Sequence, residues 1–161
     1  MKELFKTMPQ VGKVELVTIR TERKGAVKVV EQAMAKTEHG LEGDHYKKST
    51  GKRQVTLIQG EHLDAIASIL GKESIDPLLT RRNIVVRGIN IHALKEQQFQ
   101  IGEAILEGTG DCHPCSRMEQ NFGPGGYNAM RGHGGLTTRV IKSGLIKTGD
   151  EVKLIVEAKA E

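Results

Sequence analysis

Both cysteines of the chain lie in one short stretch, between Asp111 and Glu119, among residues that can make a sulfur atom reactive. Cys112 and Cys115 are the only thiols in 161 residues. The neighbouring residues that bear on their chemistry are His113, Pro114, Arg117, Arg131 and His133. Cations close to a thiol favour its thiolate form, which attacks electrophiles and binds metals. We therefore predict a functional thiolate at Cys115, stabilised by these cationic side chains where the fold brings them close.

Three other interpretations of the cysteine pair remain open. The Cys112-x-x-Cys115 spacing is half of a zinc ribbon, although the second cysteine pair is missing. A thioredoxin-like dithiol should follow the first strand of a βαβ unit, whereas this pair comes late in a strand-rich chain. Both sulfurs can also be small buried core atoms, a role that suits Cys112 better than Cys115.

Other candidate residues lie in glycine-rich segments. His133 stands between glycines, where the backbone can approach a ligand closely, and is a second catalytic candidate. Asp44 and His45 end the segment Gly40–His45; an Asp-His pair there can orient a ligand or relay a proton. Asp44 can equally satisfy backbone donors of a tight turn. His62 is expected to be an exposed residue at the start of a helix.

Length and composition indicate a single domain with an aliphatic core. A chain of 161 residues can bury a full core without disulfide staples. The chain has no tryptophan, three phenylalanines and two tyrosines, so isoleucine, valine and leucine must form most of that core. One domain over residues 1–161 is expected.

The net charge and the N-terminal sequence bear on the partners and the cellular compartment of the protein. The net charge of +4 is interspersed along the chain and does not by itself indicate nucleic acid, for which the Phe and Tyr residues offer few stacking platforms. No apolar run approaches the length of a membrane span. The first residues lack the apolar stretch of a secretory signal. We therefore expect a cytoplasmic protein with reduced thiols and no membrane partner.

The periodicity of apolar residues predicts many strands and one clear helix. Short alternating or β-branched runs predict strands at residues 11–20, 53–58, 84–86, 99–107, 137–141 and 151–156. A helical spacing of apolar residues predicts a helix over 60–70, ended by Gly71. Residues 24–36 are expected to form a strand or loop that leads into a short helix, and residues 76–79, 142–144 and 146–150 to form turns. Short strands with few helices favour a closed β-barrel over a sandwich or a βαβ sheet.

An ordered set of short motifs resembles the MOSC domain, named for the C-terminal domain of molybdenum cofactor sulfurase. The match runs from about residue 11 to residue 155. Its motifs are Gly40–His45, Arg81–Ile84, Ile101-Gly102, Cys112–Glu119, Arg131–Gly135, Arg139-Val140 and Gly149–Val152. The resemblance implies a mainly β, closed barrel with peripheral helices.

The resemblance also implies a cofactor and two classes of function. In relatives that bind the molybdenum cofactor, the family cysteine ligates the metal, and it falls on Cys115 here. The Arg-x-Asn segment that helps to hold the pterin and its phosphate falls on Arg81 and Asn83. With these we group the other candidate cofactor-binding residues, which are His45, His113, Arg117 and Arg131. In the sulfurase, the domain is proposed instead to carry sulfur received from a pyridoxal-phosphate-dependent cysteine desulfurase.

We therefore expect either a molybdenum-dependent enzyme that reduces N-hydroxylated compounds with a redox partner, or a sulfur carrier supplied by a desulfurase. Larger cofactor-binding relatives carry an additional N-terminal β domain that supplies phosphate-binding cations, whereas at most about ten residues precede the first expected strand here. Four cations of one loop, Lys47, Lys48, Lys52 and Arg53, either replace those groups or form a solvated surface. Cys112 is either a second acceptor thiol, which favours sulfur transfer, or a core residue.

Overall fold

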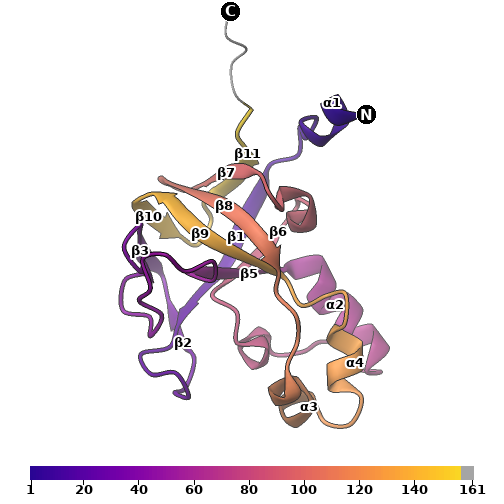
Figure 1. Ribbon diagram of the computed structural model, residues 1–161. Coiled ribbons are helices and arrows are strands. Elements are labelled where there is room, and N and C mark those ends of the chain that lie inside the picture. The colour runs from indigo at the N-terminus through magenta and orange to yellow at the C-terminus, as the bar shows by residue number, and fades with distance from the viewer. Residues whose placement is uncertain (157–161) are drawn as a thin grey trace, which may run out of the picture.

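Seven strands close into a barrel in a computed structural model that describes residues 1–156. The order around the barrel is β11 (Glu151–Leu154), β7 (Gln98–Ile101), β8 (Ala104–Asp111), β9 (Leu136–Lys142), β5 (Val55–Gln59), β6 (Ile84–Arg87) and β1 (Gly12–Ile19). Pairing of Gly12 in β1 with Val152 in β11 completes the circle. The sequence prediction of a closed β-barrel with a few helices is confirmed (Figure 1).

One neighbouring pair of barrel strands runs parallel, and the helix between them explains why. β5 and β6 are parallel, so the chain must cross over between them, and α2 (Gly60–Ile69) forms that crossover together with the 3-10 turn η1 (Pro77–Thr80). All the other barrel strands pair antiparallel. The helix predicted over residues 60–70 is therefore the one that this topology requires.

The segment over residues 24–36 differs from its prediction. It forms β2 (Lys28–Val30), which pairs with β1, and β3 (Gln32–Lys36), and no helix. β3 belongs to a second, small sheet with β4 (Gly40–Leu41) and β10 (Gly144–Lys147). The expected short helix was wrong because the β-branched Val-Lys-Val-Val run prefers an extended backbone.

Two further predictions are refined by the strand boundaries. The run 99–107 is a hairpin of two strands, β7 and β8, which turn at Gly102 with a φ of 56°. The predicted turn over 146–150 begins later, because β10 continues to Lys147. A short helix α1 (Lys2–Phe5) and a second 3-10 turn η2 (Ile91–Leu94) complete the fold.

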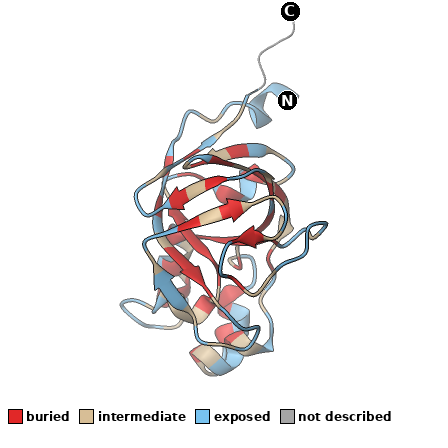
Figure 2. Cartoon of the chain, turned by 90° about the vertical axis from the view of Figure 1, so that its left-hand side faces the viewer, coloured by how far each residue is buried: buried red, intermediate tan, exposed pale blue. Residues whose placement is uncertain are grey.

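The barrel interior is aliphatic, as the composition predicts. Phe99 is the one aromatic side chain among the buried residues of this cluster, and it is packed with isoleucine, valine and leucine from every barrel strand. Figure 2 shows the buried residues concentrated along the strands, with exposed residues in the loops and in the N-terminal helix.

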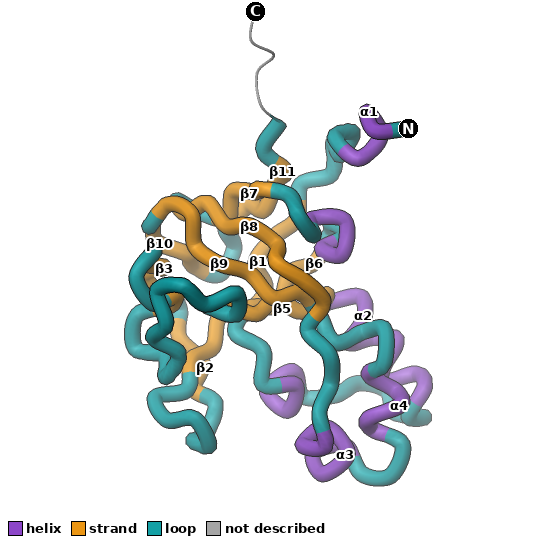
Figure 3. Tube along the Cα trace, in the orientation of Figure 1, coloured by secondary structure: helices purple, strands orange, loops and turns teal. Residues whose placement is uncertain are grey.

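A second apolar cluster holds three helices against the outside of β5 and β6. Its members are Ile58, Leu63, Ile66, Val85, Met118, Phe122, Ala129 and Met130. They join α2 to α3 (Ser116–Phe122) and α4 (Gly126–Met130), the two short helices of the β8–β9 connection. Figures 1 and 3 show these three helices gathered below the barrel, with the N-terminus and the end of β11 at the top. Within residues 1–156, no helix is both long and apolar enough to cross a membrane.

Candidate functional site

The cysteine loop leaves the end of β8, where a buried arginine fixes its backbone. Arg82 donates from Nε to the carbonyl of Gly134 over 2.7 Å and from Nη2 to the carbonyls of Cys112 at 3.4 Å and His113 at 3.3 Å. The backbone N–H of Cys112 donates to the carbonyl of Gly135 over 2.8 Å. The side chain of Arg82 therefore joins the start of the cysteine loop to the segment that leads into β9.

Glycine is required at position 134 by this close approach. A Cβ atom there would collide with the carbonyl oxygen of Cys112. The two backbone segments cannot move apart without breaking hydrogen bonds, because Arg82 donates to both of them. This explains one of the glycines of the Arg131–Gly135 motif: it lets two backbone segments touch.

The two thiols occupy opposite environments. Cys112 is buried, with 1% of its surface exposed, and its sulfur lies 3.8 Å from Nη2 of Arg53. Cys115 is exposed and stands immediately before α3. The structure forms no disulfide between them. Only Cys115 is open to a ligand or a reagent from solvent.

Arg20, at the end of β1, is a member of the site that the sequence reasoning did not single out. Its backbone N–H donates to Oδ1 of the buried Asp44 over 2.8 Å, and its Nη2 lies 3.0 Å from Nε2 of His45. A guanidinium only donates hydrogen bonds, so Nε2 of His45 is the acceptor and Nδ1 carries the ring proton. Asp44 and His45 thus orient Arg20.

The pKa of His45 is lowered from its ordinary value, first by burial and then by the positive charges of Arg20, Arg23 and Arg81, which outweigh the opposing charge of Asp44. The neutral imidazole agrees with its role as the acceptor from Arg20. Together these residues place a cation, held by a neutral histidine, beside the cysteine loop.

Arg81 is influenced both by the other cations and by the exposed thiol. Burial lowers its pKa, as do the charges of Arg20 and Arg117, while the charge of Cys115 opposes them. Its Nη2 donates to the carbonyl of Gly25 over 2.9 Å, and its backbone is left-handed, with φ 58° and ψ 34°. This strained conformation at a non-glycine residue is of the kind that clusters at functional sites.

Asn83, the partner of Arg81 in the Arg-x-Asn segment, has its side chain engaged inside the protein. Its Oδ1 accepts from the backbone N–H of Thr56 at 3.0 Å and its Nδ2 donates to the carbonyl of Thr18 at 3.1 Å. It therefore ties β1, β5 and β6 together at the point where the chain emerges beside Arg81. Its contribution to a site is positional.

His133 and Arg131 make their contacts with residues other than these cations. The ring of His133 packs edge-on against His62, with ring centroids 4.9 Å apart, and its Nδ1 lies 3.2 Å from the carbonyl of Ala129. His62 is half-buried, not exposed as expected, and burial together with the charge of His133 lowers its pKa. Arg131 is exposed, 3.4 Å from the side-chain oxygen of Asn128.

A small cavity lies on the histidine side of the cysteine loop. It measures about 150 Å³ and is lined by His62, Ile91, His92, Asp111, Cys112, His113, Pro114, Gly132, Gly134 and Gly135. His113, predicted to bind a cofactor, is exposed at this cavity. Within residues 1–156, no group of three or more His, Cys, Asp or Glu side chains is arranged to hold a metal ion.

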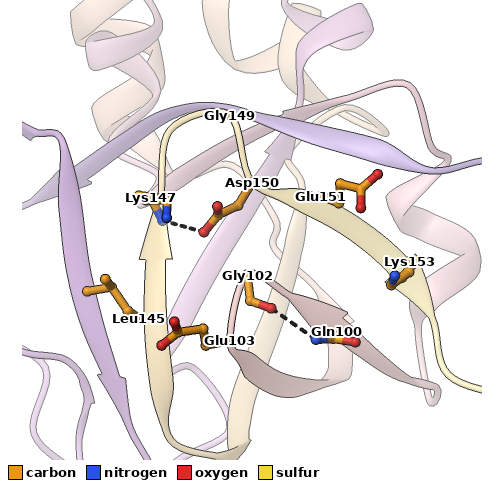
Figure 4. A pocket seen from close by; sticks show the side chains of 9 residues that line it. All are labelled: Gln100, Gly102, Glu103, Leu145, Lys147, Gly149, Asp150, Glu151 and Lys153. Atoms are coloured by element: carbon orange, nitrogen blue, oxygen red, sulfur yellow. Dashed lines mark hydrogen bonds between the residues drawn. The ribbon is translucent and has the colours of Figure 1, made fainter.

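A larger cavity lies elsewhere, around the turn between β10 and β11. Its volume is about 320 Å³. Figure 4 shows four charged side chains that line it, Glu103, Lys147, Asp150 and Lys153. Asp150 accepts from the backbone N–H of Lys147 over 2.8 Å, and a side chain at Gly102 would collide with this carboxylate. The Ile101-Gly102 and Gly149–Val152 motifs therefore shape a turn of the barrel.

A closed β-barrel with one exposed cysteine beside an arginine-rich loop end defines the class of this protein. The model of the MOSC domain matches residues 42–153, and the chain belongs to the MOSC domain family. The resemblance read from the sequence motifs is thereby confirmed. MOSC domains are associated with binding of the molybdenum cofactor or with sulfur chemistry. No curated protein matches the chain by sequence.

Solved structures share the fold. The YuaD protein of Bacillus subtilis superposes with a TM-score of 0.80 at 20% identity, covering 94% of this chain and all (100%) of that chain. YiiM of Geobacillus stearothermophilus gives a TM-score of 0.74 at 14% identity, covering 90% of this chain and 75% of that one. YiiM of Escherichia coli gives 0.68 at 18% identity, covering 92% and 72%. At these identities the likeness concerns the fold.

Proposed function

We propose that this protein binds the molybdenum cofactor, with Cys115 as the protein ligand of the metal and Arg20, Arg81 and Arg117 around the pterin phosphate. The observation that supports this best is the coincidence of one exposed thiol with three mutually repelling guanidinium groups. Guanidinium groups held together against their own repulsion are suited to an anionic ligand.

The residues present fit such a cofactor by their chemistry. A thiolate is a soft ligand that suits a sulfur-rich molybdenum centre, and the exposed sulfur of Cys115 is open to it. Arg20 and Arg81 each use part of their donors on protein acceptors, which leaves further N–H groups for phosphate oxygens. When bound, the cofactor would supply the two-electron chemistry that reduces an N-hydroxylated compound.

The remaining side chains would hold these groups in place. Asp44 and His45 orient Arg20, and Arg82 fixes the backbone of the loop that presents Cys115. Neutral His45 also offers its Nδ1 proton as a hydrogen-bond donor toward a ligand. His133 contacts His62 and Arg131 contacts Asn128, so this proposal assigns neither of them a role at Cys115.

A sulfur carrier is the second candidate, and the exposure of Cys115 favours it equally. A solvent-open thiolate among cations can accept a sulfane sulfur from the persulfide of a pyridoxal-phosphate-dependent desulfurase and pass it to another acceptor. In a two-thiol form of this mechanism, the second cysteine would have to be accessible to attack the persulfide. The burial of Cys112 argues against that form.

Elemental analysis beside persulfide labelling separates the two functions. The protein is purified from a host that makes the cofactor and assayed for molybdenum per chain and for labile sulfur on Cys115. About one molybdenum per chain, lost in Cys115→Ser and kept in the matched Cys112→Ser variant, supports the cofactor proposal. Labile sulfur on Cys115 without molybdenum supports the carrier. Neither metal nor sulfur, or metal retained in Cys115→Ser, contradicts the proposal.

A further inference from the structure

The buried arginine that holds the cysteine loop has no carboxylate partner. Arg82 has 8% of its surface exposed, and among residues 1–156 it forms no ion pair. Its guanidinium donates to backbone carbonyls alone, which are those of Thr80, Cys112, His113 and Gly134. A buried charge is costly unless opposite charge or hydrogen bonds compensate it. Here peptide groups provide the compensation, and the arginine in turn orients them.

Two of these peptide groups direct their N–H ends away from the arginine. In a trans peptide bond the C=O and N–H groups point in opposite directions, and residues 1–156 contain no cis peptide bond. The carbonyl of Cys112 shares a peptide group with the N–H of His113, and the carbonyl of Gly134 shares one with the N–H of Gly135. Both carbonyls accept from Arg82, so both N–H groups point away from the guanidinium.

The N–H groups of these two loops lack acceptors, whereas the carbonyls are used. In the part of the chain that the structure describes, the backbone N–H groups of His113, Gly134 and Gly135 have no hydrogen-bond acceptor, although Gly134 is buried. The carbonyls of the same three residues all accept, from Arg82 or from the N–H of Cys112. Backbone donors are rarely left unpaired, and oriented N–H groups of this kind form sites for anions.

The small cavity beside the cysteine loop is lined by the residues that carry these donors. His113, Gly134 and Gly135 lie around its volume of about 150 Å³. Two imidazole rings of the lining are free as well. Within residues 1–156, neither the ring of His62 nor that of His113 makes a hydrogen bond, in contrast to the ring of His92. Each free ring can add a donor to the backbone N–H groups.

The carboxylate that lines this cavity is already paired. Asp111 lies 3.2 Å from Nζ of Lys95 and 3.1 Å from Nδ1 of His92. Its oxygens are therefore engaged by donors, and the polar groups that remain for a ligand are mostly donors themselves. Ile91 and Pro114 add apolar surface to the lining, which suits the carbon atoms of an organic ligand.

We propose that this cavity binds a small carboxylate, a short-chain organic acid. Its oxygens accept from the N–H groups of His113 and Gly135 and from the ring of His62, and its carbon chain packs on Ile91 and Pro114.

Charge and size both favour this class of ligand. A carboxylate bound to the two oriented peptide groups would place a negative charge at the ends opposite Arg82, which has no counter-ion of its own. Drug-sized ligands occupy pockets of about 300–1,000 Å³, so this cavity suits a much smaller molecule. Cys115 is not among the lining residues, and the inference therefore goes beyond the proposed cofactor function.

Titration of the ¹⁵N-labelled full chain with sodium acetate, followed by NMR at constant ionic strength, tests the proposal. The backbone amide signals of His113, Gly134 and Gly135 should shift and saturate together, with one dissociation constant between about 0.1 and 10 mM. Acetamide has nearly the same shape and no charge. It should bind about tenfold more weakly, because hydrogen bonds to a charged acceptor are the stronger ones.

Three variants locate the site. His62→Phe removes the ring donor and should weaken acetate binding about tenfold, while His62→Gln keeps a side-chain N–H and should stay within about threefold of the wild type. His39→Phe is the matched control, since His39 lies in the turn between β3 and β4 and does not line the cavity. The titration of the wild type decides the proposal even if His62→Phe fails to fold.

The outcomes also separate this inference from the proposed function. Cys115→Ser removes the proposed molybdenum ligand and should bind acetate as the wild type does. Shifts that rise linearly with acetate, or equal responses to acetate and acetamide, would overturn the carboxylate site even if molybdenum is found. Saturable shifts of the His62 and His113 signals with zinc chloride, without any response of the glycine amides to acetate, would indicate a metal site and also overturn it. Acetate binding by a protein that never acquires molybdenum would keep this inference and discard the cofactor proposal.

Discussion

Nη2 of Arg20 lies 3.0 Å from Nε2 of His45, and this contact fixes the protonation state of the histidine. The guanidinium has no lone pair to offer, so the contact exists only while Nε2 is unprotonated. The backbone N–H of Arg20 also donates to the buried carboxylate of Asp44. Arg20 is thus oriented by a histidine whose pKa is lowered from its ordinary value by burial and by neighbouring arginines.

Stability should fall with acidification because of His45 and His62. Each has a pKa lowered from its ordinary value of 6.5, so the unfolded chain takes up these protons at higher pH than the folded chain. The stabilising contribution is present above pH 6.5, decreases as the pH falls below it and levels off below the folded pKa values. Melting temperatures between pH 7.5 and about pH 5 should decrease less in His45→Gln and His62→Gln than in the wild type.

The control for this experiment is His113→Gln, since His113 is exposed. Its melting temperature should follow the wild-type pH dependence. A pH dependence as steep in His45→Gln as in the wild type would show that the Arg20–His45 contact does not depend on the neutral ring.

The two thiols should differ in accessibility by their burial. Iodoacetamide added to the folded protein should label Cys115 and leave Cys112 unlabelled, while both react in about 6 M guanidinium chloride, where the domain is unfolded. Peptide mass spectrometry reports the label at each position. Labelling of Cys112 at the rate of Cys115 in the folded protein would contradict the packing of the cysteine loop.

Local pattern was sufficient for the barrel, and it singled out Cys115, which the structure leaves exposed, but it was insufficient for the cations of the candidate site. Alternation of apolar residues predicts β1 and β11 separately, and the Pro114-Cys115 step marks the loop. Arg20 could not be assigned, because it enters the site only when β1 pairs with β6 and its loop folds against Arg81. A sequence signal existed nonetheless: Arg20 is the last residue of a predicted strand and leads into a basic segment.

The sequence made His133 a candidate because it stands between glycines and could stabilise the thiolate of Cys115 where the fold brings the two close. In the chain, α3 and α4 lie between the two residues, and the glycine-rich composition concealed these helices. Gly125 has a φ of 91° and starts α4, while Glu119 accepts the N–H groups of Gly125 and Tyr127. This carboxylate cap, seen only in three dimensions, turns the chain so that His133 faces His62 on α2.

Alanine at position 134 should destabilise the fold by overlap with the cysteine loop. Gly134→Ala places a methyl group against the carbonyl of Cys112, which the hydrogen bond from Arg82 holds in place. The substitution should lower the free energy of unfolding by about 2–3 kcal/mol. Urea titration measures the change. The matched control is Gly110→Ala, where the nearest atom to a new Cβ is 3.6 Å away and the change should stay within about 0.5–1 kcal/mol.

The left-handed backbone of Arg81 yields a prediction that separates strain from function. Glycine adopts a φ of 58° without steric cost, so Arg81→Gly should be more stable than Arg81→Ala by about 1 kcal/mol, although both lose the same guanidinium and the hydrogen bond to Gly25. Chemical unfolding of the pair gives the difference. Both variants should equally lose phosphate binding, because the cation and not the backbone contacts the anion. If Arg81→Gly instead keeps wild-type phosphate affinity while Arg81→Ala loses it, backbone geometry at this position would be the functional element, and the guanidinium would have only a structural role.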